Sequence, residues 1–84
     1  MERMELLQRL EQVERQIAED TELIARQRKV LADLRGKGVD NGAIQIMLVG
    51  LENLLVVHLQ EREKLRGEIA KLDSSTQGPK PSGR

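Results

Sequence analysis

Residues 43–59 read AIQIMLVGLENLLVVHL, and this segment decides the fold. If it is helical, at 100° per residue, its apolar side chains fall on two nearly opposite faces. One face continues downstream at spacings of three and four, as in a helix packed along one neighbour; it consists of Ile44, Leu48, Leu51, Leu55, His58, Arg62, Leu65, Ile69 and Leu72. We call the other face the outer stripe; it consists of Ile46, Val49, Gly50, Asn53, Val56 and Val57.

The outer stripe predicts a second interface. One helix–helix contact covers one face, and a helix that is apolar on both sides is normally buried all round or lies in a membrane. A membrane span needs about 20 largely apolar residues, whereas Gln45, Glu52, Asn53 and His58 interrupt this segment. We therefore expect burial against protein, either a second copy of the chain or a different protein, and no membrane contact.

The composition narrows the classes of protein that this chain of 84 residues can be. Fourteen acidic and fourteen basic residues give a formal net charge of zero, so there is no overall attraction to nucleic acid or to an anionic membrane. Aromatic residues and cysteine are absent, which removes base-stacking platforms, disulfides and thiol chemistry. The charged N-terminus lacks the apolar core of a signal peptide, and we expect a cytoplasmic protein.

The remaining sequence predicts an all-α fold of one domain, an antiparallel two-helix hairpin over residues 1–72. Residues 3–35 contain neither Gly nor Pro and form the first helix. Residues 36–40, GKGVD, form a turn in which Gly36 closes the first helix and Asp40, with Asn41 as competitor, caps the second. The second helix covers about residues 41–72. A short connection makes the helices antiparallel neighbours, and residues 73–84 are predicted to be a disordered tail.

One layer between the predicted helices is polar. Folding the hairpin about Gly38 brings together residues whose numbers sum to about 76–79, and apolar positions then meet apolar positions except near Asp20, His58 and Arg62. The simplest interpretation is a contact that fixes register, in which Asp20 accepts a hydrogen bond from His58 and the Arg62 head lies in water or on Glu14. Because imidazole changes charge near neutral pH, a pH-sensitive joint is a second interpretation.

Catalytic and metal-binding roles for this layer have less support. One His and one Asp are too few metal ligands unless a second subunit supplies another pair, and neither a nucleophile nor a deep pocket is expected nearby. We therefore predict no enzymatic activity, no cofactor and no metal. A nucleic-acid-binding hairpin is a lesser alternative, and its candidate residues are Arg26, Arg28, Lys29, Arg35 and Lys37.

Several short motifs lie between about residues 14 and 69: Ile17-Ala18-Glu19, Ile24-Ala25-Arg26-Gln27-Arg28, the Asp40 turn, His58, Arg62 and Leu65. In these motifs the chain resembles a group of short bacterial two-helix proteins of unknown function. Members of the group often have histidines where this chain has Gln16, Leu23 and Glu61, and an aromatic residue where it has Leu51. The resemblance implies a helical hairpin and brings no activity, substrate or cofactor.

Small chains rarely bury enough surface to be stable alone, and without disulfides or metal the remaining remedy is self-association. The sequence therefore predicts a non-enzymatic structural or interaction protein, a coiled-coil-like hairpin that pairs with a second copy into an antiparallel four-helix bundle. Asn53 would then lie near the two-fold axis. The alternative is a small adaptor or regulator that binds a different protein through the outer stripe.

Overall fold

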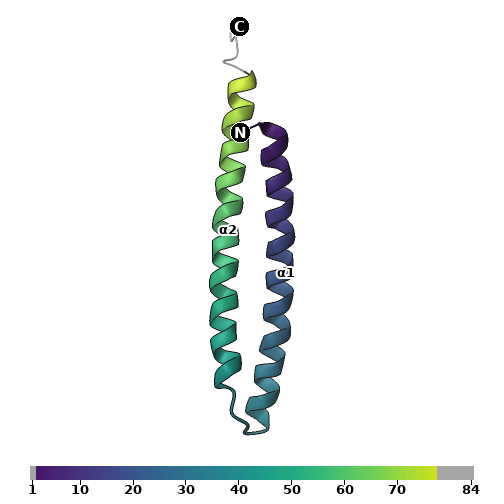
Figure 1. The fold of residues 1–84 in the computed structure, drawn as a ribbon, viewed down its shortest axis with the longest axis vertical. Helices are drawn as coiled ribbons and strands as arrows, with labels where there is room; N and C mark the ends of the chain where they lie inside the picture. Colours follow the sequence, from purple (N-terminus) through teal and green to yellow (C-terminus); the bar gives the residue numbers. More distant parts are fainter. Residues whose placement is uncertain (1, 78–84) are drawn as a thin grey trace.

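Two long helices make up the computed structural model, which describes residues 2–77. Helix α1 is Arg3–Gly36 and helix α2 is Gly42–Gln77. They run antiparallel, side by side, and are joined by a short turn (Figure 1). The molecule measures 70 × 23 × 14 Å, and no strand occurs within the described range. The all-helical hairpin predicted from the sequence is confirmed.

Gly38 makes the turn, with a positive φ of 71° that favours glycine. The sequence analysis assigned helix closure to Gly36, but α1 continues through Gly36 and the left-handed residue comes two positions later. The N–H of Gly38 donates to the Arg35 carbonyl at 3.1 Å and the N–H of Val39 to the Leu34 carbonyl at 3.0 Å. The last carbonyls of α1 are thereby satisfied before the chain reverses.

Both candidate caps take part in starting α2. The Asn41 carbonyl accepts the first helical hydrogen bond, from the Gln45 N–H at 3.1 Å. The Asp40 carboxylate accepts a hydrogen bond from the Gly42 N–H at 3.1 Å. Asp40 therefore caps with its side chain while Asn41 holds the position at which the helical bonding begins.

Helix α2 ends later than predicted. Residues 73–77 are helical, whereas the sequence analysis placed them in a disordered tail; the rest of that tail, residues 78–84, lies outside the described residues. Nothing in Asp73-Ser74-Ser75-Thr76-Gln77 breaks a helix, because the next Gly or Pro is Gly78. Asp73 also gains a partner on α1, where Arg3 donates to it at 2.7 Å.

The apolar core between the helices is thin. Among the described residues the buried apolar side chains are Leu6, Ile24, Leu48 and Leu65. All four lie on the facing seams, since two helices alone exclude water only along their line of contact. The hairpin therefore leaves the remaining apolar side chains of α2 partly or largely in water.

Ion pairs between the helices flank this core on both sides. Arg28 contacts Glu52 at 2.7 Å and Arg66 contacts Glu14 at 3.1 Å on one flank, and Arg9 contacts Glu61 at 3.2 Å on the other. Exposed pairs of this kind contribute only about 0–1 kcal/mol each. They hold the register of the hairpin more than they stabilise it.

Candidate interaction surface

Large apolar side chains are concentrated on the half of α2 next to the turn. The six exposed ones between residues 46 and 57 have exposed fractions of 43–75%; they are Ile46, Met47, Val49, Leu54, Val56 and Val57. Gly50 and Asn53, at the centre of the same surface, are also exposed. We call these eight residues the apolar patch. It contains the whole outer stripe that the sequence analysis singled out.

Met47 and Leu54 belong to the patch but were not predicted to. They are seven residues apart, and a further step of seven leads to Glu61, so they lie on the flank marked by the Arg9–Glu61 ion pair. Val30 of α1, three steps of seven from Arg9, lies on the same flank and is 40% exposed. At the edge of a seam, exposure depends on how each helix is rotated about its own axis, and spacing alone does not fix that rotation.

Beyond Val57 the outer surface of α2 is polar. Gln60, Glu63, Lys64 and Lys71 are exposed there, and Glu63 forms an ion pair with Arg66 at 3.3 Å. The outer stripe is thus confined to the interval from residue 46 to residue 57, about 17 Å of helix length.

The composition of α2 also bears on membrane contact. Within the described residues, the segment Gly42–Ser74 is long and apolar enough to cross a membrane, and 6% of its most apolar window is buried in the hairpin. The core helices of soluble proteins also meet this criterion of length and composition. The expectation of no membrane contact therefore stays a prediction.

The polar layer lies deeper in the molecule, where Asp20 and His58 meet across the two helices. Asp20 is 6% exposed, and its Oδ2 lies 2.5 Å from Nδ1 of His58. In the tautomer that carries its hydrogen on Nδ1, His58 donates this hydrogen bond to the Asp20 carboxylate. The contact satisfies a carboxylate that would otherwise be buried at a cost of several kcal/mol.

Arg62 stands apart from this contact. Its Nε is buried and has no hydrogen-bond partner, and the nearest carboxylate oxygen in an ion pair is that of Glu63, at 3.7 Å. Glu14, one of the two predicted environments of the Arg62 head, instead accepts a hydrogen bond from Arg66 at 3.1 Å. The three residues of the predicted layer are therefore neighbours in the seam without forming one network.

The chemistry available in this layer is limited to the Asp20–His58 contact. Within residues 2–77, His, Asp and Glu side chains do not gather in groups of three or more that would hold a metal ion. One imidazole and one carboxylate supply two of the four ligands that zinc usually takes.

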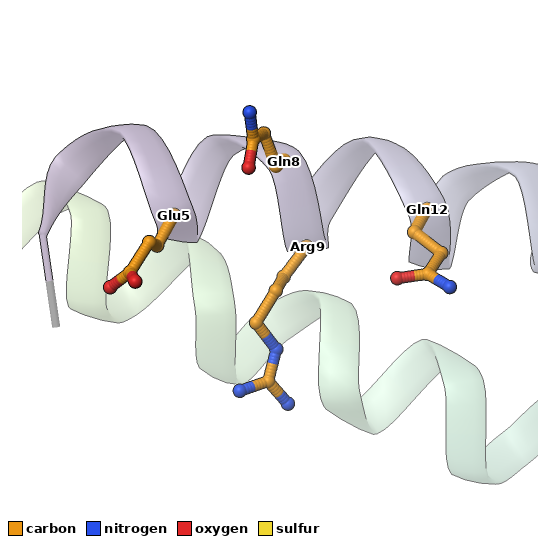
Figure 2. A pocket seen from close by; sticks show the side chains of 4 residues that line it. All are labelled: Glu5, Gln8, Arg9 and Gln12. Carbon is orange, nitrogen blue, oxygen red and sulfur yellow. The ribbon is translucent and has the colours of Figure 1, made fainter.

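Two of the surface hollows lie along the N-terminal part of α1. One is lined by Glu5, Gln8, Arg9 and Gln12, all on α1; Figure 2 shows that these side chains diverge, with Gln8 pointing away from α2 while Arg9 reaches towards it. The other lies between the helices and is lined by Arg9, Glu61, Lys64, Leu65 and Glu68. Binding sites for small molecules are concave and gather convergent polar groups. The first hollow lacks such convergence, and in the second Arg9 and Glu61 pair with each other at 3.2 Å.

The basic residues near the end of α1 are all exposed. Two of them have acidic partners: Arg28 contacts Glu52 at 2.7 Å and Lys37 contacts Asp33 at 3.2 Å. The local positive charge is therefore partly neutralised within the hairpin, which weakens its pull on phosphates.

Comparison of the chain with protein-family models, with curated proteins and with solved structures found no match.

Proposed function

We propose that this chain is a non-enzymatic structural or interaction protein that self-associates through the apolar patch, two hairpins forming a four-helix bundle. One observation carries the proposal: six large apolar side chains are 43–75% exposed on a hairpin with four buried apolar side chains among its described residues. Soluble proteins rarely leave contiguous apolar surface of this kind in water unless it binds something.

The energy available from the patch is large enough for association. Fully burying one Val, Leu, Ile or Met side chain is worth about 1.5–3 kcal/mol, and the six side chains are on average about half exposed. Completing their burial is therefore worth roughly 5–10 kcal/mol per copy. The free energy gained by burying the patches of both copies is larger than most values in the range of about 4–15 kcal/mol that association costs in lost translational and rotational freedom.

Protein is a better occupant for the patch than lipid. If α2 crossed a membrane, Glu52 and His58 would enter the hydrocarbon together with their α1 partners, Arg28 and Asp20, or would lose those partners. A charged residue at the centre of a bilayer costs at least about 2.5–3.5 kcal/mol. A second hairpin covers the patch and leaves both contacts intact.

The test is the solution mass of the untagged protein, measured by sedimentation equilibrium over a range of concentrations. Interference optics are needed because the chain has no aromatic residues. We expect twice the chain mass of 9.5 kDa, retained at micromolar concentration. A folded monomer would refute self-association and would assign the patch to a different protein, as in a small adaptor. Co-sedimentation with lipid vesicles would instead favour the membrane.

A further inference from the structure

Resting on the self-association proposed above, we propose a specific geometry for the pair. The two α2 helices pack antiparallel about a two-fold axis that passes between Leu51 and Glu52. Only the halves of the α2 helices next to the turns overlap. The end of each hairpin that lies opposite its own turn therefore projects past the turn of the partner. The occupant of the patch is thus a second copy of this chain in a single orientation and register.

The spacing of the outer stripe sets the register. Ile46, Gly50, Asn53 and Val57 follow one another at intervals of four, three and four, a pattern that reads the same in both directions. In an antiparallel pair, facing residues then have numbers that sum to about 103, because both helices rise equally per residue. Ile46 faces Val57 of the partner, and Gly50 faces Asn53 of the partner.

The edges of the patch also match: their paired residues have numbers that sum to 101 and 105, within two residues, or about 3 Å of helix rise, of the central register. Along one edge Met47 lies against Leu54 of the partner, and along the other Val49 lies against Val56 of the partner. These are the exposed apolar side chains of the patch that the central pairs leave out. Every large apolar side chain of the patch therefore meets an apolar side chain, which is the self-complementarity that a two-fold interface requires.

The centre of the patch suits close contact. A Cβ added at Gly50 would have no atom within 4 Å in the hairpin, so the partner helix is free to approach the backbone there. The Asn53 amides of the two copies lie only about 4.5 Å apart along the axis. At that separation they can bond to each other, as buried Asn residues do when they fix register in paired helices.

The polar half of α2 argues against a parallel pair. In a parallel pair identical residues face each other, so Glu63 would face Glu63 and Lys64 would face Lys64. Such like-charge contacts are unfavourable. In the antiparallel pair these residues lie instead near the turn of the partner, which offers one charge of each sign, Lys37 and Asp40.

The shape of the pair follows from the position of the axis. The α2 helices overlap for about 30 Å, and about 24 Å of each hairpin projects beyond the overlap. The two Arg3–Asp73 ion pairs then lie at opposite ends of the dimer, about 65 Å apart along the axis. A four-helix centre would thus present two identical two-helix ends.

Disulfide trapping tests the geometry, and the absence of cysteine from the chain makes each introduced thiol unambiguous. The experiment uses the variants Ile46→Cys and Val57→Cys. Each is oxidised separately, and then a mixture of the two is oxidised after its subunits have exchanged. The products are compared by intact mass. We expect cross-linking only in the mixture, as the heterodimer. Identical Val57 residues lie about 16 Å apart along the axis in the antiparallel pair, far beyond the Cα separation of about 4–7 Å that a disulfide spans.

Asn53→Cys serves as the control for self-association, because it cross-links in either orientation. If it cross-links while Ile46→Cys and Val57→Cys each cross-link alone, the pair is parallel and the antiparallel geometry is refuted. If it cross-links while the mixture does not, the register is wrong. If it does not cross-link and the wild-type protein sediments as a monomer, the proposed self-association itself fails.

Discussion

Val57→Lys tests the apolar patch most directly. The Val57 side chain is 56% exposed in the hairpin, so burial in a dimer removes about half of a valine from water. With about 1.5–3 kcal/mol for a whole side chain, each copy contributes about 0.8–1.7 kcal/mol. Both copies carry the substitution, so the dimer loses about 2–3 kcal/mol, which corresponds to a roughly 30- to 150-fold rise in Kd. Desolvation of the two ammonium groups would weaken it further.

Sedimentation equilibrium measures the change in Kd, and far-UV circular dichroism measures the accompanying loss of helix. We expect Val57→Lys, and likewise Val49→Lys, to give a poorly folded monomer, because the core of the single hairpin is thin. Ala70→Lys is the matched control: it adds the same charge at an exposed position in the polar half of α2 and should leave the dimer unchanged. If Val57→Lys dimerises as tightly as Ala70→Lys and is equally helical, the patch is not the interface.

Further predictions concern the seam, the base and the turn. Asp20→Ala leaves the half-buried His58 without its partner in the seam and should cost about 1–3 kcal/mol, seen as a lower Tm. Asp20→Leu combined with His58→Leu should recover that loss, and failure to do so would show that the contact itself stabilises the fold. The hydrogen bond from Arg3 lowers the pKa of Asp73. The stability that this ion pair adds is therefore present above about pH 4 and is lost as the pH falls through the lowered pKa. Asp73→Asn should lower Tm at neutral pH and match the wild type in strong acid, and a difference that persists in acid would contradict this cause. Gly38→Ala forces alanine to a φ of 71° and should cost about 1 kcal/mol, whereas Gly36→Ala, which meets open space in the last turn of α1, should cost nothing in the same thermal melts.

Local signals along the chain predicted the helices well and their ends less well. Residues 3–35 lack Gly and Pro, and the prediction of helix there differs from α1 by one residue. The end of α2 was predicted five residues too early, because apolar periodicity stops at Leu72 while the helix continues through residues that include neither Gly nor Pro. The ion pair of Asp73 with Arg3 is a contact between residues distant in sequence, which no local pattern reports.

The surface was predictable in part. Spacing placed Ile46 and Val57 opposite the seam, and the structure leaves them 75% and 56% exposed. Met47 and Leu54 were missed because they lie at the edge of the seam, where a small rotation of the helix decides between burial and exposure. The ion-pair partners of the charged side chains could not be predicted from the sequence either: Arg66, not Arg62, forms the ion pair with Glu14.

The sequence by itself determined that this chain is two amphipathic helices joined by a short turn about Gly38 and that the second helix carries more apolar surface than one neighbour covers. Both follow from periodicity and from the conformational limits of glycine, which are properties of short segments. The contact of Asp20 with His58, at 2.5 Å, was also expected from the sequence and is confirmed. Only the tertiary structure decided which edge of the seam stays in water and which arginine meets which carboxylate. These depend on the relative rotation and register of two helices, and side chains far apart in the sequence fix that rotation together.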